Sequence, residues 1–370
     1  MKILVVFGTR PEAIKMLPVV RALRARPAFE TVVVVTGQHR QMLDQVFDVF
    51  GEKADIDLDI MTPGQTISDV TVRILNEMRD LLTEQKPDLV LVHGDTTTAM
   101  ATAMAAFYAR VPIGHVEAGL RSHDINHPWP EEFNRVVIDS VAHWLFAPTQ
   151  ASADNLLRES RRDRVIAVTG NTGIDALLYI AGRPDRDHIA ELGIPLDPSK
   201  RMVLVTGHRR ESFGGGFERI CDGLARIAGR DDVEIVYPVH LNPQVKDVVT
   251  ERLSGHDNVH LIAPVGYATM VALMKRATLI LTDSGGIQEE APALGKPVLV
   301  MREVTERPEA VETGVVSLVG TDPEVMADAV FKLLDDPVYY ATRARTVFPF
   351  GDGTAAEKIA DILENHRSLP

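Results

Sequence analysis

Short apolar runs alternate with longer amphipathic segments along most of the chain, and this alternation constrains the fold more than any other feature. The first half contains the runs KILVVFG, TVVVVTG, DLVLVHG, VPIGHVE and HWLFAPT, each bounded by glycine, proline or polar residues. The segments around them predict helices over Pro11–Arg26, Ile67–Gln85, Thr97–Arg110 and Glu131–Val141. Strand–helix alternation of this kind produces a parallel sheet that helices cover on both faces.

A second alternating set follows a connection rich in proline and charge, residues 181–200, whose middle could hold a short helix. Its strand-like runs are RMVLVTGH, VEIVYPVH, NVHLIAP, TLILTDSGG and KPVLVM, and Thr354–His366 is expected to form a terminal helix. The 370 residues suit two domains of roughly 100–200 residues each rather than one core. We therefore predict an α/β protein with two doubly wound parallel sheets.

Composition limits the class of partner. The formal net charge of -13 argues against nucleic-acid binding and against binding to anionic membranes, both of which favour a basic face. A small anionic ligand remains compatible, since a few arginines and helix N-termini are enough to bind it. Cys221 is the only cysteine, which excludes an intramolecular disulfide and fits a reducing cytoplasm. The first apolar run, Ile3–Phe7, is too short for a signal sequence or a membrane span.

Two of the polar motifs that follow the strand-like runs suit anion binding. In doubly wound folds ligands bind at the carboxyl ends of strands, so we expect both domains to point these motifs at a shared cleft. Arg10 and Lys15 stand near a helix N-terminus, where backbone amides favour an anion, although they could equally be surface cations. His208 and Arg209 precede the glycine run Gly214–Gly216, which could instead be a hinge flanked by solvated charges.

Other motifs supply carboxylates at strand ends. Asp95 follows a buried run, and a helix cap explains it at least as well as a catalytic role does. Glu117 ends the next apolar run and is harder to explain as a cap. Glu131 and Arg135 are four residues apart on a predicted helix, so they share a face and can form an ion pair.

Two other patterns point away from cofactors. No G-x-G-x-x-G follows a strand, so the fingerprint of dinucleotide binding is missing. The segment Asp55–Asp59 alternates acidic and apolar residues, which predicts a half-exposed strand more simply than a metal site.

The motifs together resemble a known family. In order and spacing, the following eight are similar to those of the non-hydrolysing UDP-N-acetylglucosamine 2-epimerases, from Lys2 to at least Glu309: GTRPEAIKMLP, TGQHRQML, HGDTTTAM, HVEAGLRS, PEEFNR, TGHRRES, TDSGGIQEEAP and TERPE. The resemblance implies a GT-B fold, with Rossmann-like domains over residues 1–170 and 171–350 facing a central cleft. It also implies that the C-terminal helix, residues 351–370, packs back on the first domain.

The same resemblance implies an activity. Family members interconvert UDP-GlcNAc and UDP-ManNAc, usually as homodimers, without a metal or a nicotinamide cofactor, and the product supplies cell-surface polysaccharide synthesis. The C2 hydrogen of the sugar is not next to a carbonyl, so it is hard to remove as a proton. One route removes it while UDP leaves, which gives a 2-acetamidoglucal. UDP then adds back after reprotonation from the other face. This route needs carboxylates for proton transfer and cations for the departing diphosphate.

The resemblance implies three groups of site residues. The catalytic group is Asp95, Glu117, Glu131, Arg135 and His208, and the first base among the carboxylates stays unassigned. The UDP-sugar group is Arg10, Lys15, Ser284, Gly285, Gly286, Glu290, Arg307, Tyr267 and Met270. A regulatory UDP-GlcNAc site in some relatives corresponds to Gln38, Gln41, Arg209 and His240, but Gly64 here replaces a basic residue of regulated members.

The motif TDSGGIQEEA carries the most specific expectation about orientation. Ser284 with the amides of Gly285 and Gly286 is expected to bind the diphosphate, and Glu290 the ribose hydroxyls, as in family members. Glu289 points to another side of the helix and is expected to be structural.

Three alternatives stay open from the sequence. A hydrolysing epimerase would release ManNAc and UDP, a GT-B glycosyltransferase would need an acceptor, and a UDP-sugar-binding regulator would show no turnover.

Overall fold

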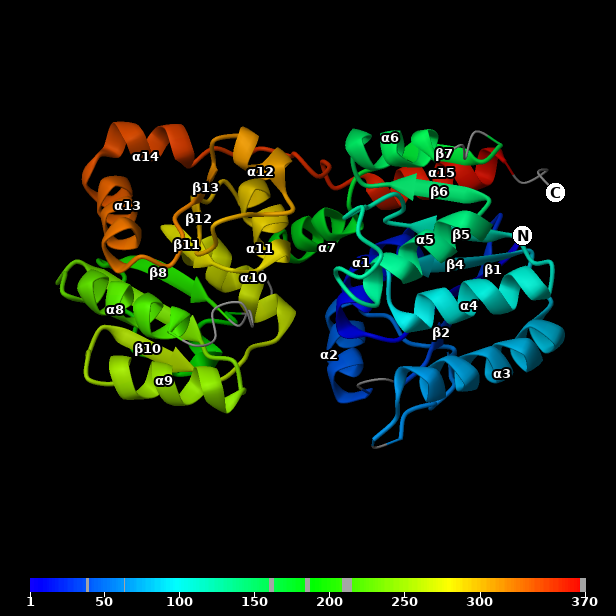
Figure 1. Ribbon diagram of the computed structural model, residues 1–370, viewed down its shortest axis with the longest axis horizontal. Helices are drawn as coiled ribbons and strands as arrows, with labels where there is room; N and C mark the ends of the chain where they lie inside the picture. Colours follow the sequence, from blue (N-terminus) through cyan, green and yellow to red (C-terminus); the bar gives the residue numbers. More distant parts are fainter. Residues whose placement is uncertain (38–39, 63, 160–162, 184–186, 208–214, 367–370) are drawn as a thin grey trace. The chain divides into compact units, whose positions relative to one another are not determined.

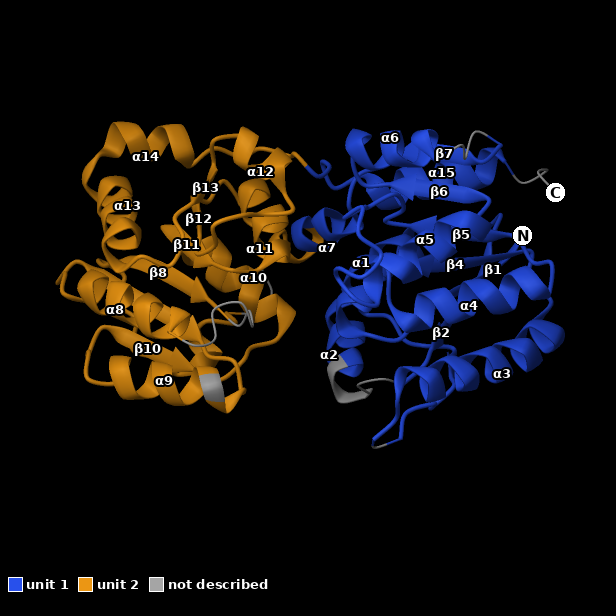
Figure 2. Ribbon diagram, viewed as in Figure 1, with its two compact units in different colours: residues 1–178, 350–370 blue, residues 179–349 orange. Residues whose placement is uncertain are grey.

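The computed structural model describes residues 1–37, 40–62, 64–159, 163–183, 187–207 and 215–366, without the side chains of 40–42 and 244 (Figure 1). The chain divides into two compact units (Figure 2). Unit 1 comprises residues 1–178 and 350–370, and unit 2 comprises residues 179–349.

Unit 1 contains a seven-stranded parallel sheet in the order β3-β2-β1-β4-β5-β6-β7. Its strands are β1 Lys2–Phe7, β2 Glu30–Val35, β3 Ile56–Asp57, β4 Leu89–His93, β5 Ile113–Val116, β6 Trp144–Ala147 and β7 Val165–Val168. The central strands β1, β4 and β5 are rich in β-branched and aliphatic residues and are buried almost throughout, as expected of strands covered on both faces.

The helices of unit 1 are α1 Arg10–Arg24, α2 Arg40–Phe50, α3 Ile67–Gln85, α4 Thr97–Tyr108, α5 Glu131–Val141, α6 Gln150–Arg158 and α15 Ala355–Asn365, while α7 Thr172–Ala181 crosses the boundary between the units. Leu4 and Val6 of β1 pack in one apolar core with α3, α4 and α5. On the opposite face, Phe7 stacks on Phe47 of α2 with ring centroids 6.0 Å apart. The sheet is therefore wound on both sides.

Unit 2 repeats this plan with a six-stranded parallel sheet in the order β10-β9-β8-β11-β12-β13. Its strands are β8 Arg201–Thr206, β9 Val233–Pro238, β10 Val259–Ile262, β11 Leu279–Thr282, β12 Val298–Val300 and β13 Val316–Leu318. Its helices are α8 Gly216–Ala228, α9 Pro243–Leu253, α10 Tyr267–Arg276, α11 Gly285–Glu290, α12 Pro308–Glu312, α13 Pro323–Asp335 and α14 Pro337–Arg343, with 3₁₀ turns at Ala190–Leu192 and Ala291–Leu294. The predicted pair of doubly wound parallel sheets is confirmed.

In each sheet the strand order reverses beside the strand that comes first in the sequence. β1 lies between β2 and β4, and β8 lies between β9 and β11. Such a reversal of strand order opens a crevice beyond the carboxyl ends of the strands, where ligands bind in this class of fold. The polar motifs of the sequence follow these strands.

The last helix, α15, packs on α1 within unit 1. The Arg26 guanidinium, just beyond α1, lies 2.9 Å from Glu357, 2.7 Å from Asp361 and 3.3 Å from Glu364. Three acidic residues on one face of α15 therefore share one cation.

Asp175 of α7 fixes the start of the same helix. Its carboxylate accepts a 2.8 Å hydrogen bond from the backbone N–H of Ala356. Burial raises the pKa of Asp175 from 3.8 to about 6, and backbone donors at Ala355 and Ala356 oppose this only in part. Folding thus favours the protonated acid, so the stabilisation is present below the unfolded pKa and is lost as the pH rises through about 6.

We expect Asp175→Asn, which stays uncharged and can still accept a hydrogen bond, to gain stability relative to the parent as pH rises. The gain between about pH 4.5 and about pH 7.5 should approach 2 kcal/mol, because the raised pKa makes ionisation costly in the folded state. Urea unfolding of both proteins at the two pH values measures it, with Asp328→Asn, an exposed residue of α13, as control. A difference that does not change with pH would contradict the expectation.

Candidate active site

The site in unit 1 is built from turns that leave β1, β4 and β5. Glu117 follows β5 directly and has a left-handed backbone, with φ of 70°, which a residue with a side chain rarely adopts. The N–H groups of Glu117 and Ala118 both donate to the carbonyl of Phe146, at 3.0 Å each. These bonds hold the backbone turn at Glu117 against β6.

The Glu117 carboxylate lies between two basic side chains. Lys15 Nζ donates to both carboxylate oxygens, at 2.8 and 2.9 Å, and His93 Nε2 lies 2.7 Å from Oε2. Burial alone raises the pKa of this carboxyl, but the charges of Lys15 and His93 outweigh burial and hold the pKa of Glu117 well below its usual range. Glu117 is therefore ionised at neutral pH.

Asp95 follows β4 and is held by two residues of α5. Arg135 lies 2.8 Å from its Oδ2, and the Asn134 side chain donates to its backbone carbonyl at 2.8 Å. Burial raises the pKa of Asp95, Arg135 opposes the shift, and the negative charges of Glu117 and Glu131 add to it. The pKa values of the Asp95 and Glu117 carboxyls thus shift in opposite directions, an arrangement typical of acid–base sites.

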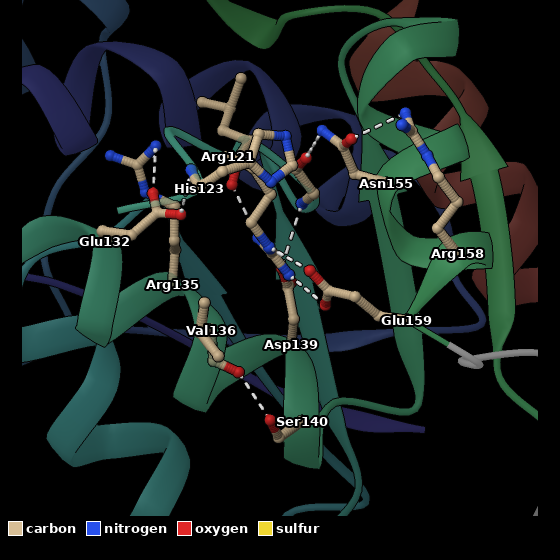
Figure 3. A network of polar contacts seen from close by, with 12 residues as sticks. Arg121, His123, Glu132, Arg135, Val136, Asp139, Ser140, Asn155, Arg158 and Glu159 are labelled. Carbon is tan, nitrogen blue, oxygen red and sulfur yellow. Dashed lines mark hydrogen bonds and ion pairs between the residues drawn. The ribbon is translucent and has the colours of Figure 1, made fainter. Parts of the chain in front are cut away.

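The helix α5 pairs its charged side chains differently from the sequence expectation. Spacing alone favoured a pair between Glu131 and Arg135, but Arg135 contacts Asp95 and, at 3.5 Å, Glu132. Glu132 is buried and accepts hydrogen bonds from the backbone of Ser122 and His123 at 3.0 and 3.2 Å (Figure 3). Glu131 is half-buried at the first position of the helix.

A buried polar cluster lies beneath the turns that follow β4 and β5. Asp139 of α5 lies 2.6 Å from His115 of β5 and 2.8 Å from Arg121, and it accepts a hydrogen bond from the Gly119 N–H at 3.2 Å. Arg121 in turn contacts Glu159 at 2.6 and 2.8 Å (Figure 3).

Glu12 joins the turn that follows β1 to the turn that follows β4. Its carboxylate accepts from the N–H groups of Gly8 and Thr9 at 3.0 and 2.7 Å, and from the Thr96 hydroxyl at 2.7 Å. Thr9 and Glu12 form the capping box of α1. This contact fixes the start of α1 near the start of α4.

Arg10 opens α1, and burial lowers the pKa of its guanidinium. Lys15 lies on the same helix and turns toward Glu117. The structure thus brings Lys15, Asp95, Glu117, Glu131 and Arg135 into one neighbourhood of unit 1.

In unit 2, the turn after β11 places Ser284 at the N-cap of α11, followed by Gly285 and Gly286. The Arg307 guanidinium lies against Gly285, because a Cβ built there would stand 3.2 Å from Arg307 Cζ. Arg307 also pairs with the buried Glu289 at 2.8 Å.

The other end of α11 contacts α10. The Tyr267 hydroxyl donates to Glu290 Oε1 at 2.8 Å, and burial followed by the Glu290 charge raises the Tyr267 pKa. Met270 lies one turn further along α10 and is half-buried. The two glutamates thus have different partners: Glu289 pairs with Arg307, and Glu290 accepts a hydrogen bond from Tyr267.

Some predicted residues lie outside the described parts of the structure. These are Gln38, His208 and Arg209, together with the side chain of Gln41 and the first residue of the glycine run, Gly214. His240 is described and exposed, and its Nδ1 accepts from the Asn242 N–H at 3.1 Å. Gly64 has a left-handed backbone with φ of 78° and open space around it.

Two searches of the described residues concern other kinds of site. No cluster of three or more His, Cys, Asp or Glu side chains with the spacing of a metal site occurs among them. None of the described helices combines the length and apolar character needed to cross a membrane.

Comparison with known proteins identifies the family. A family model described as UDP-N-acetylglucosamine 2-epimerase matches residues 21–364. This chain belongs to the UDP-N-acetylglucosamine 2-epimerase family. It is 56% identical to the UDP-N-acetylglucosamine 2-epimerase of Yersinia pestis and 55% identical to that of Escherichia coli K12, covering 99% of each chain. The family resemblance predicted from the eight motifs is confirmed.

A solved structure extends the comparison to the fold. The UDP-GlcNAc 2-epimerase of Neisseria meningitidis, bound to UDP-GlcNAc, matches with a TM-score of 0.91 and 45% identity. The match covers 99% of this epimerase-family chain and 100% of the Neisseria chain. It supports the GT-B assignment for the two parallel-sheet units.

Sequence reasoning missed several residues that organise the site. His93, Glu12 and Glu132 all contact site turns, and His115 and Asp139 lie beneath them. The S/T-x-x-E pattern from Thr9 to Glu12 could have revealed the capping box. The two histidines had no such signal, because their partners come from other turns of the sheet.

We expect Lys15→Met to raise the pKa of the Glu117 carboxyl, because the substitution removes the cation that contacts both of its oxygens. Carboxyl ¹³C NMR of glutamate-labelled protein measures this pKa, and Glu117→Gln assigns the signal. The control is Lys2→Met, which removes a surface cation 3.3 Å from Glu30. A Glu117 titration that stays where it is in the parent would show that Lys15 does not set its charge.

Proposed function

We propose that this chain reversibly epimerises UDP-GlcNAc at C2 to give UDP-ManNAc. The observation that carries the proposal is identity above one half, along the whole chain, with the UDP-N-acetylglucosamine 2-epimerases of Yersinia pestis and Escherichia coli. The carboxylates at the strand ends of unit 1 and their basic partners supply chemistry that suits this reaction.

In the proposed reaction the C2–H bond breaks and the proton passes to a carboxylate while the C1–O bond breaks. The electron pair of the C–H bond forms the C1=C2 double bond of a 2-acetamidoglucal, and UDP leaves with the pair from C1–O. A proton delivered to the opposite face of C2 and re-addition of UDP to C1 complete the epimerisation. Atoms and charges balance without an oxidant.

The two pKa shifts suggest an assignment of roles. Asp95 suits the proton acceptor, since burial raises its pKa and makes its carboxylate the stronger base. Glu117 is ionised and holds no proton of its own, so the proton delivered to the opposite face would come from its basic partners Lys15 or His93, which the Glu117 carboxylate orients. In the reverse direction the roles exchange. Glu131 adds negative charge beside Asp95 and is the third carboxylate of the group.

Residues of unit 2 are proposed to bind the UDP part. Ser284 and the amides of Gly285 and Gly286 would bind the diphosphate, with Arg307 adding a positive charge beside Gly285. Glu290 would accept hydrogen bonds from the ribose. Tyr267, which contacts Glu290, and Met270 would lie on the uracil side. Arg10 and His208 would complete the binding of the departing diphosphate.

Several wider features belong to the same proposal. The protein would act as a homodimer in the cytoplasm, without metal or nicotinamide, and would supply UDP-ManNAc for cell-surface polysaccharide. A regulatory UDP-GlcNAc site would use Gln38, Gln41, Arg209 and His240, and Gly64 leaves it without the basic residue of some relatives.

The reaction is tested with purified protein and UDP-GlcNAc alone in D₂O. We expect UDP-ManNAc that carries deuterium at C2, detected by NMR, because the abstracted proton exchanges with solvent. Accumulation of free ManNAc and UDP would indicate a hydrolysing epimerase, and turnover only with an added acceptor would indicate a glycosyltransferase. UDP-ManNAc without deuterium would exclude the elimination route.

We expect Asp95→Asn to lower kcat by a factor of about 10² to 10⁴, the usual contribution of a general acid or base, while UDP binding is kept. Calorimetric titration with UDP and the epimerase assay measure the two effects separately. Asp154→Asn, which changes an exposed carboxylate on α6 bonded to Gln150, is the matched control. Comparable kcat values for the two variants would remove Asp95 from the proton transfer.

A further inference from the structure

His115 is a fully buried histidine with a partner at each ring nitrogen. Nε2 lies 2.7 Å from the backbone carbonyl oxygen of Gly94, and Nδ1 lies 2.6 Å from Asp139 Oδ1. A carbonyl oxygen can only accept a hydrogen bond, so Nε2 carries a hydrogen. The contact at Nδ1 then decides whether the ring is neutral or positively charged.

The environment of Asp139 shows that Nδ1 also carries a hydrogen. Burial would raise the pKa of Asp139, but Arg121, a permanent cation 2.8 Å from Oδ2, and the Gly119 N–H stabilise the ionised form of this carboxyl. Its Oδ2 is already occupied by Arg121 at 2.8 Å and by the Gly119 N–H at 3.2 Å. An ionised carboxylate accepts at Oδ1, and the ring must donate there as well.

His115 begins a chain of polar contacts that runs from the core to the surface. His115 contacts Asp139, Asp139 contacts Arg121, and Arg121 contacts Glu159, which is exposed. The side chain of Arg121 is only 2% exposed and that of Asp139 is fully buried, so each charge depends on its neighbours for compensation. Figure 3 shows the Arg121 guanidinium in contact with both Asp139 and Glu159.

This chain of contacts reaches the turn that carries Asp95 and the turn that carries Glu117. Gly94 lies between His93 and Asp95, and Gly119 follows Glu117 by two residues. Gly94, Glu117 and Gly119 all have left-handed backbones, with φ of 65°, 70° and 85°. The left-handed backbone is strained only at Glu117, since glycine adopts it freely. The Gly94 carbonyl and the Gly119 N–H, one on each turn, bind to the His115–Asp139 pair.

We propose that His115 is a buried imidazolium that acts as a positioning residue, fixing the turn of Asp95 against the turn of Glu117 through Gly94 and Asp139. The inference rests on the proposed function for the roles of the two carboxylates. His115 touches neither carboxylate side chain in this arrangement; it acts through the backbone. Its substitution should therefore change turnover through the spacing of Asp95 and Glu117.

The charge state is tested first, without any assay of turnover. Long-range ¹H–¹⁵N NMR of full-length wild-type protein labelled in histidine should show two protonated nitrogens for His115, assigned through His115→Gln. His143 is an internal control, because its Nδ1 accepts from the Ile113 N–H at 3.3 Å and should show one protonated nitrogen. A single protonated nitrogen at His115 would overturn the proposal.

The positioning role is tested by two substitutions that keep different halves of the contact. In His115→Gln the side-chain N–H₂ can reach Gly94, whereas in His115→Asn it can reach only Asp139. We expect kcat with UDP-GlcNAc to fall about tenfold in His115→Gln, which keeps the contact to the turn of Asp95. In His115→Asn, which loses that contact, kcat should fall about a hundredfold, the usual cost of misplacing a catalytic group by about 1 Å. KM should change by less than about threefold in both, because the UDP contacts remain.

The control is His143→Gln, which changes a histidine bound to the opposite end of β5 and should keep kcat within about twofold. Lower melting temperatures in both His115 variants with unchanged kcat would mean a structural role only and would overturn the proposal. If the wild-type protein does not turn over UDP-GlcNAc, the proposed function fails, and the NMR measurement still reports the charge of His115.

Discussion

All strands within each sheet run parallel, so their carboxyl ends collect along one edge, and the chemistry of this protein depends on that constraint. The strands themselves are mostly apolar and buried, and His93 of β4 and His115 of β5 are the strand residues described above that contact the polar turns. The turns find their other partners in neighbouring turns or in helices. Glu12 joins the first turn to Thr96, and α5 reaches the turns after β4 and β5.

Burial acts on Asp95 and Glu117 in the same direction, and their neighbours decide the difference. Glu117 has Lys15 on both oxygens and His93 beside one, and these charges outweigh desolvation. Asp95 has Arg135, which offsets only part of the desolvation, and nearby acidic groups oppose its ionisation further. Two carboxyls of similar intrinsic acidity therefore differ in basicity because one has more positive charge around it.

Local sequence rules predicted the elements well and the polar partners poorly. The helices Ile67–Gln85 and Glu131–Val141 were predicted at the bounds that the structure gives, because their apolar residues recur at helical spacing. The pairing of Arg135 was not predictable in this way. Helix spacing favours Glu131, but the turn of Asp95 comes within 2.8 Å from another part of the chain. Tertiary neighbours decided this contact.

Histidines show the same limit. His93 ends β4 and His115 lies within the next strand, β5, and nothing in their local motifs distinguishes a core residue from a partner of Glu117 or Asp139. The eight motifs specified the family, yet they did not reveal which side chains support others. The family resemblance carried the roles of Ser284 and Glu290, whereas their contacts to neighbouring side chains became visible only in the fold.

The contacts made by α5 have a consequence for how this chain can vary in length. Glu132, Arg135 and Asp139 lie along one side of the helix and bind three separate turns. Adding or removing one residue inside α5 would rotate everything beyond that point by about 100° and would displace Asp139 and its neighbours together. Substitutions on the outer face leave that register unchanged. The helix therefore tolerates changes of composition on one side but has a fixed number of residues.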